Sequence, residues 1–233
     1  MMGYDDIFKS ISEKIVEYDP EVDAIILLMD REAFSSIKHV VVFTKRPKDY
    51  LGYISAVEKV PNKPFAVNII VQQSLRPPTI ELGRIFTGKY HLLFGDGNLV
   101  ERTLRLTGFT FKHVEEKLKA LKNRPKELKD IVDAITRDTE IRLFYKALAE
   151  AVWMASIALL VKKAWKFGNV SENLPPELRE EYEQLISDFY DEAYVKGNYP
   201  RAEDKKGMKK LLEKAWKRAK NYVKKVKKLS KKL

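Results

Sequence analysis

The stretch from residue 22 to residue 45, VDAIILLMDREAFSSIKHVVVFTK, contains two apolar runs joined by a polar turn. The runs at 24–29 and 39–43 are rich in β-branched residues and nearly continuous, which predicts two neighbouring strands that are buried on both faces. In a mixed chain, helices cover such a sheet. Open α/β sheets bind ligands at strand ends, so the polar residues of the turn are the first candidates for a site. These residues are Asp30, Arg31, Glu32, Ser35, Ser36 and Lys38.

Helix and strand signals alternate around this stretch. Apolar spacings of three and four residues predict helices, short β-branched runs predict strands, and Pro or Gly separates them. Residues 99–111 are compatible with a strand by alternation, and the spacing then turns helical. The predicted order is helix 4–18, strand 22–29, strand 38–44, helix 50–57, strand 65–72, helix 79–86 and strand 90–94.

From residue 126 onward the pattern is helical throughout. The last helix, 202–233, has apolar residues at alternating spacings of four and three, which indicates one continuous packing seam. The fold class is therefore α/β followed by all-α, with a small mixed sheet and helices at 1–110, a helical linker at 111–136 and an antiparallel helical bundle at 137–233. The other expected features are an apolar stripe at Leu128, Ile131, Val132 and Ile135, a helix at 141–167 and a helix at 177–196.

Composition limits the classes of function. The 233 residues include no Cys, which excludes disulfides, thiol catalysis and thiolate metal sites and predicts a cytoplasmic protein. The first residues are acidic, unlike those of a secretory signal. The longest apolar stretch, 147–161, contains Glu150 and is shorter than the roughly 20 residues that a membrane helix needs. It predicts a buried core helix.

The net charge of +11 lies at the C-terminal end. Residues 201–233 hold fifteen Lys or Arg and three acidic residues, so they carry +12 while the first 200 residues carry −1. Lysines at this density can neutralise several phosphates, which predicts salt-sensitive nucleic-acid binding without sequence preference. The alternative, which the pattern slightly favours, is a solvated helix whose lysines keep the long apolar seam soluble. The candidate nucleic-acid-binding residues are Lys209, Lys210, Lys214, Lys217, Arg218, Lys220, Lys224 and Lys225.

The element order of residues 4–97 resembles the minimal nucleotidyltransferase fold of the small antibiotic-nucleotidyltransferase-like domains. In that family a Gly-Ser turn follows the first strand, a Ser-Asp-x-Asp motif opens the second, and a third Asp lies on the next strand. This chain has Ser35-Ser36-Ile37-Lys38 at the motif position, and its residues 92–96, Leu-Leu-Phe-Gly-Asp, look like a later strand of the family. The resemblance implies the fold of residues 1–110.

The metal-binding positions of the motif differ in this chain. Ser36, Lys38 and Asn68 stand where the family has carboxylates, and Met29-Asp30 stands in place of Gly-Ser. Nucleotidyl transfer needs a divalent metal held mostly by carboxylates, and a lysine repels that metal. The resemblance therefore implies a degenerate copy without a metal or another cofactor. The hypothesis is direct phosphate binding, and the alternative is that Lys38 is a solvated strand-end charge. The candidate ligand-binding residues are Ser35, Ser36, Lys38, Asp30, Asn68 and Asp96.

Residues 137–229 resemble the HEPN (higher eukaryote and prokaryote nucleotide-binding) domains that often partner such nucleotidyltransferases. The resemblance lies in the apolar helix 147–161, an aromatic-rich helix, the turn 197–200 (Gly-Asn-Tyr-Pro) and the Lys-rich last helix. Ribonuclease members carry an Arg followed four to six residues later by His. Because His113 is the last histidine here, RNA cleavage is not implied. The family and the long seam together imply a homodimer.

Three functions follow from these observations. The leading prediction is a non-catalytic or regulatory protein that binds nucleotide or nucleic-acid phosphate, without a membrane partner. The competing prediction is an active nucleotidyltransferase that holds Mg²⁺ with Asp23, Asp30 and Asp96. The third is a structural or assembly protein. A zinc site is not expected, because His39, His91 and His113 are far apart in sequence and have no Cys or nearby carboxylate at ligand spacing.

Overall fold

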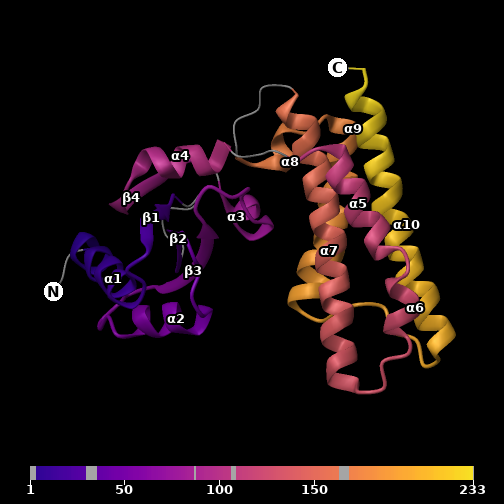
Figure 1. The fold of residues 1–233 in the computed structure, drawn as a ribbon, viewed down its shortest axis with the longest axis horizontal. Helices are drawn as coiled ribbons and strands as arrows, with labels where there is room; N and C mark the ends of the chain where they lie inside the picture. Colours follow the sequence, from indigo (N-terminus) through magenta and orange to yellow (C-terminus); the bar gives the residue numbers. More distant parts are fainter. Residues whose placement is uncertain (1–3, 30–35, 87, 106–108, 163–167, 233) are drawn as a thin grey trace. The chain divides into compact units, whose positions relative to one another are not determined.

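The chain folds as two compact units (Figure 1). The computed structural model describes residues 4–29, 36–86, 88–105, 109–162 and 168–232. The first unit contains residues 1–107 and 166–169, and the second contains residues 108–165 and 170–233. The predicted fold class is confirmed, because a small mixed sheet with helices is followed by a helical bundle.

A four-stranded sheet in the order β3-β2-β1-β4 forms the centre of the first unit. Strand β2 (Ile37–Thr44) runs parallel to β3 (Ala66–Gln73) and antiparallel to β1 (Val22–Leu28). Strand β4 (Tyr90–Gly95) runs antiparallel to β1 on its other side. The parallel step from β2 to β3 requires a crossover, and α2 (Tyr50–Glu58) supplies it.

Helices pack on both faces of this sheet. Helix α1 (Tyr4–Tyr18) and α2 cover the face that carries Val40 and Val42, where apolar residues of both helices form one core cluster. Val41 and Phe43 point to the opposite face, because side chains alternate along a strand, and both are fully buried. Helices α3 (Ile80–Ile85) and α4 (Gly97–Arg105) pack on β3 and β1. Burial on both faces agrees with the continuous apolar runs of the sequence.

A buried carboxylate joins α1, β2 and α2. Asp19 is fully buried and accepts hydrogen bonds from the Thr44 hydroxyl at 2.8 Å, the Tyr53 hydroxyl at 2.5 Å and the Glu21 backbone N–H at 3.1 Å. These donors satisfy the charge that burial would otherwise make costly. Asp19 therefore ties the end of the first helix to the sheet and to α2.

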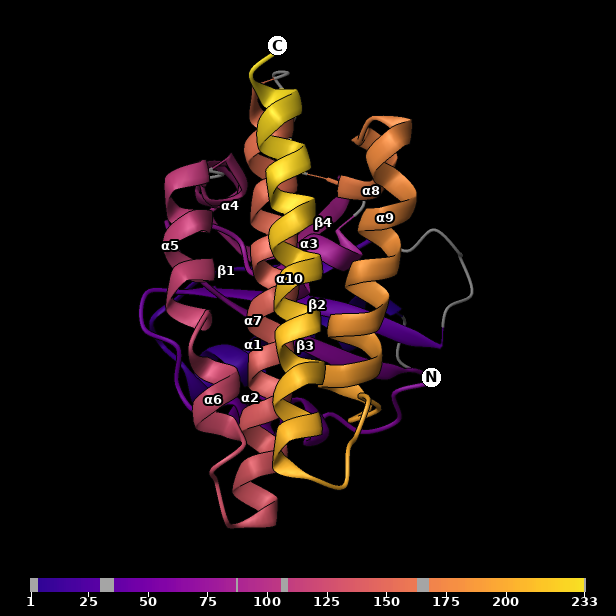
Figure 2. The ribbon, with the colours of Figure 1, turned by 90° about the vertical axis from the view of Figure 1, so that its right-hand side faces the viewer.

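The second unit is an up-and-down helical bundle (Figure 2). The Ser156 and Tyr222 hydroxyls are 2.7 Å apart and Lys162 donates to the Ser230 carbonyl, so α7 and α10 run parallel. The bundle is antiparallel, as predicted: α5 and α6 run in one direction, α7 in the other, α9 with η1 in the first again, and α10 parallel to α7 (Figure 1). The described elements of the second unit are α5 (Phe111–Leu121), α6 (Arg124–Leu128), α7 (Ala134–Val161), α8 (Val170–Asn173), α9 (Pro176–Ile186), the π-helix η1 (Ser187–Val195) and α10 (Lys205–Ser230).

Helix α7 is the centre of the bundle. It packs against α5, α9, η1 and α10, and its residues from Leu148 to Leu160 are almost all buried. By length and hydropathy α7 could cross a membrane, but 72% of its most apolar window is buried inside the bundle. The apolar seam of α10 packs against neighbouring helices of the same chain, with Leu212, Ala219 and Val226 fully buried. That seam is therefore not available as a dimer face.

Four expectations about elements differ from the structure. Residues 97–105 form α4 rather than a strand, because the buried residues Val100 and Leu104 are spaced as on a helix. The predicted linker at 111–136 contains α5 and α6, which pack on α7 and α10 within the bundle. The stripe ending at Ile135 is wrong, because Val132 and Ile135 are 88% and 79% exposed. Helix α7 begins at Ala134 rather than 141, and residues 163–167 lie outside the described part of the chain.

Buried tyrosines predict a loss of stability at alkaline pH. Burial raises the pKa of Tyr145 to about 12 and raises the pKa of Tyr53 and Tyr222 further. An unfolded tyrosine loses its proton near pH 10 while these folded groups keep theirs, so the unfolded state binds fewer protons above that pH. The free energy of unfolding should therefore fall as pH rises above about 10. Urea titrations from pH 8 to pH 11 measure it.

Variants assign this pH dependence to the buried phenols. Tyr222→Phe should flatten the fall in stability above pH 10, because the variant has no phenol to ionise at that position. Tyr4→Phe is the matched control, since Tyr4 is 62% exposed, and it should keep the wild-type slope. Equal slopes in all three proteins would contradict this explanation.

Candidate nucleic-acid interface

The residues predicted to bind a ligand at the sheet end do not converge on one face. Lys38 pairs with Val67 in the parallel register, and both point to the face covered by α1 and α2. Asn68 is one residue further along and therefore points to the opposite face. Ser36 is exposed just before β2, while Asp30 and Ser35 lie outside the described residues. The expected group of Ser36, Lys38 and Asn68 is thus divided between two faces.

His39 takes the place that the sequence argument gave to Lys38. It is the register partner of Asn68, and the Asn68 amide nitrogen lies 2.9 Å from the His39 Nδ1. Residues two apart share a face, so Ile37, Val41 and Phe43 are the other β2 positions on this side, and all three are apolar. Counting the motif from Ser35 places Lys38, and not His39, at the position expected to bind a ligand. The alternation of side chains, anchored on Asn68, would have indicated His39.

Asp96 has a structural role far from this pair. It follows Gly95, whose φ of 83° and close approach to the Asp23 carbonyl leave no room for a Cβ. The Asp96 side chain accepts a hydrogen bond from the Asn98 backbone N–H at 2.8 Å, at the start of α4. Asp96 therefore caps α4, and it lies at the opposite end of the sheet from Asn68.

The three carboxylates of the competing prediction are also separated. Asp23 lies beside Asp96, since the Asp96 backbone N–H donates to the Asp23 carbonyl at 3.1 Å. Met29 is at the other end of β1, about 20 Å away at roughly 3.3 Å per residue. Asp30 itself is not described. Among the residues that are described, no three His, Asp or Glu side chains are grouped closely enough to hold a metal ion.

The outer face of α10 carries a continuous row of lysines. Because a helix turns once in 3.6 residues, spacings of four and three place these residues on one face, opposite the buried seam. All of them are exposed, and the row extends over about 33 Å at 1.5 Å per residue. Asn221 is the one uncharged residue within it. We call this row the lysine stripe: Lys206, Lys210, Lys214, Lys217, Lys224 and Lys228.

The stripe lysines differ from the basic residues beside them. In the described part of the chain, no carboxylate lies within ion-pairing distance of a stripe lysine. Four predicted residues lie on the flanks instead and have partners. Lys209 pairs with Glu213, Arg218 with Asp188 and Lys225 with Glu181, while the Lys220 ammonium lies 4.7 Å from the centre of the Trp216 ring.

Acidic side chains border the stripe on one side. Glu177 and Glu180 of α9 line a cavity with Arg218 and Asn221. Figure 2 shows α9 on one side of α10 and α5 with α6 on the other. The basic surface is therefore narrow, and it follows the axis of α10. Such a row can contact successive phosphates of one strand, each contact releasing a condensed counterion.

Comparison with known proteins gives little further information. No protein-family model and no curated protein matches the chain. A solved structure with some similarity is the spectinomycin adenyltransferase from Enterococcus faecialis, determined with ATP and spectinomycin. Its identity is 11% and its TM-score 0.32, over 93% of this chain and 98% of that chain. A likeness at this level carries no inference about activity.

Proposed function

We propose that this chain is a non-catalytic protein that binds the phosphate backbone of nucleic acid along the outer face of α10. The lysine stripe carries the proposal. Solubility alone is best served by interspersed charges of both signs. A row of lysines with acidic residues only along its flanks, where they pair with other basic side chains, attracts a polyanion instead. The stripe residues are exposed, so binding requires no rearrangement of the bundle.

The first unit supports the non-catalytic part of this proposal. Metal-dependent nucleotidyl transfer needs carboxylates that meet on one face of the sheet. The β2 positions that share a face with Asn68 are Ile37, His39, Val41 and Phe43, of which only His39 is polar. An imidazole and an amide can hydrogen-bond a phosphate, but they cannot supply the hard anionic oxygens that Mg²⁺ prefers. The unit thus fits a degenerate copy of a nucleotidyltransferase-like domain.

A homodimer stays a prediction of the HEPN resemblance. The seam that also suggested it is buried within the chain. A dimer would therefore use another face of the molecule.

The proposal predicts salt-dependent binding. Fluorescence anisotropy with a short labelled RNA, and with DNA of the same sequence, should show binding at low salt that weakens as salt rises. The logarithm of the affinity should fall linearly with the logarithm of the salt concentration, with a slope of about −4 if roughly five phosphates are contacted. An assembly protein without a nucleic-acid ligand would bind neither oligonucleotide even at the lowest salt.

One further measurement separates binding from catalysis. The protein is incubated with labelled ATP and Mg²⁺, with and without RNA. Transfer of label to protein, RNA or a small acceptor would contradict the non-catalytic part and favour the active nucleotidyltransferase.

A further inference from the structure

A groove of about 480 Å³ lies between η1 and α10, next to the lysine stripe. Its volume is within the range of sites that hold small ligands. Leu211, Ala215 and Phe189 contribute apolar surface to it, and Lys214 of the stripe lines it from α10. The groove therefore opens where a phosphate bound to Lys214 would lie.

A guanidinium plane is held at this groove. Arg218 lies over the Phe189 ring, 5.5 Å from its centre, and pairs with Asp188 at 2.7 Å. These two contacts fix the orientation of the guanidinium, while its side chain remains 41% exposed. A guanidinium plane that is oriented and partly exposed in this way is a surface on which an unstacked nucleobase can stack.

Hydrogen-bonding groups face the groove from η1 and the turn after it. The Asn198 amide donates to the Glu192 carboxylate at 2.9 Å, and Lys196 donates to the same carboxylate at 2.6 Å. These hydrogen bonds hold the pKa of Glu192 below its usual range, so the carboxylate stays ionised and acts only as an acceptor. A π-helix such as η1 is uncommon and is frequent at functional sites.

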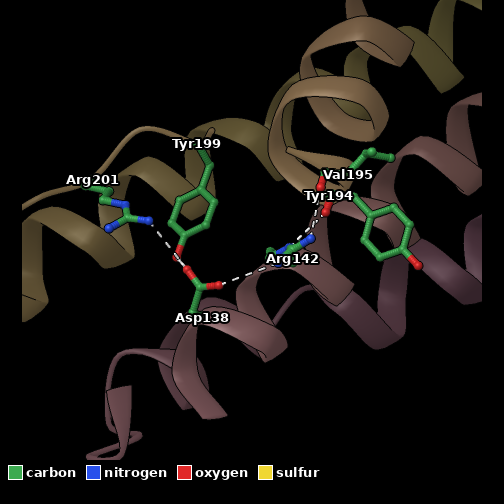
Figure 3. A network of polar contacts seen from close by, with 6 residues as sticks. All are labelled: Asp138, Arg142, Tyr194, Val195, Tyr199 and Arg201. Atoms are coloured by element: carbon green, nitrogen blue, oxygen red, sulfur yellow. Dashed lines mark hydrogen bonds and ion pairs between the residues drawn. The ribbon is translucent and has the colours of Figure 1, made fainter. Parts of the chain in front are cut away.

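A polar network fixes the turn that closes the groove (Figure 3). The Tyr199 hydroxyl donates to Asp138 at 2.6 Å, and Arg201 lies 3.5 Å from the same carboxylate. Arg142 donates to the carbonyls of Tyr194 and Val195 at the end of η1. Helix α7 thus anchors both sides of the turn, and Asn198 is held between these anchors.

We infer that this groove takes one unpaired base of a single-stranded nucleic acid whose phosphates lie on the lysine stripe. The inference rests on the proposed function and names its substrate class. A base in a duplex is stacked and paired, so moving it into the groove costs the free energy of unstacking and unpairing. An unpaired base of a single strand avoids the cost of unpairing. The Glu192 carboxylate can accept a hydrogen bond from the exocyclic amino group of a base. Cytosine has such an amino group and uracil does not, so the groove should favour cytosine.

Competition between oligonucleotides tests the inference with the full chain. Anisotropy is measured with an oligo(C) strand, an oligo(U) strand and a hairpin duplex at one salt concentration. We expect oligo(C) to bind about tenfold more tightly than oligo(U). We expect the same ratio between oligo(C) and the hairpin when both affinities are expressed per binding site. Leu211→Trp fills the groove and should remove this preference while leaving hairpin affinity unchanged. Leu143→Trp, at an exposed position of α7, is the matched control.

The possible results separate the groove from the stripe. Equal affinity for all three ligands, or a Leu211→Trp variant that weakens all three equally, would overturn the groove inference and leave the stripe intact. If the protein binds no oligonucleotide, the proposed function fails, and titration with CMP and UMP tests the groove alone. Shifts of the Leu211 methyl and Asn198 amide NMR signals with CMP, larger than with UMP, would then support it. No shift with either would end it.

Discussion

The triple variant Lys210→Glu, Lys217→Glu, Lys224→Glu should bind a short RNA about a hundredfold more weakly than the wild type at 0.1 M salt, or not measurably. Each replacement removes one phosphate contact and puts a carboxylate beside the next phosphate. The salt dependence should become shallower by about two units of slope, because three fewer phosphate contacts release fewer counterions. Fluorescence anisotropy over a range of salt concentrations measures both quantities.

A charge-matched control separates the stripe from net charge. Lys59→Glu, Lys89→Glu and Lys122→Glu change the total charge equally, and all three positions are exposed and lie outside α10. This control should keep most of the wild-type affinity and the wild-type slope. If both triple variants lose affinity to the same extent, binding follows net charge rather than the stripe, and the interface proposed on α10 is wrong.

Asp19→Ala should destabilise the first unit by about 3–5 kcal/mol. The change leaves the Thr44 and Tyr53 hydroxyls buried without their acceptor, at roughly 1–3 kcal/mol each, and adds a small cavity. Trp153 on α7 and Trp216 on α10 belong to the second unit. Far-UV circular dichroism should therefore show an early unfolding transition that the fluorescence of these two tryptophans does not report.

Two further variants test the Asp19 account. Tyr53→Phe keeps the ring and removes one of the hydrogen bonds, so it should cost about 1–2 kcal/mol. Asp49→Ala is the matched control, since Asp49 is exposed and its side chain does not cap α2, and it should change stability by less than about 0.5 kcal/mol. A cost for Asp19→Ala no larger than that of the control would show that this carboxylate does not hold the unit together.

Much of the fold could be predicted from local patterns. The strands at 22–28 and 37–44 follow from β-branched runs, and α1, α5 and α10 follow from apolar spacing and from the Pro or Gly residues near their ends. The predictions failed where a pattern was short or ambiguous. The alternation at Leu104, Leu106 and Phe109 leaves residues 99–111 ambiguous between strand and helix, and residues 97–105 form a helix because it buries Val100 and Leu104.

The candidate binding residues on α10 were also predictable only in part. The basic face of α10 follows from helical spacing alone, because residues four and three apart share a face wherever the helix packs. The sequence named Lys210, Lys214, Lys217 and Lys224 for that reason. It could not separate them from Lys209, Arg218, Lys220 and Lys225, because the partners of those residues include Asp188 and Glu181 on other elements.

The sequence by itself determined the two-part architecture, the buried sheet and the basic last helix, since each depends on residues near one another in the chain. Only the tertiary structure decided which strand positions face each other. The parallel register of β2 and β3 pairs His39 with Asn68, and a shift by one residue would turn Lys38 to that face instead. The groove beside Lys214 is likewise formed by segments distant in sequence, whose meeting depends on how the helices pack.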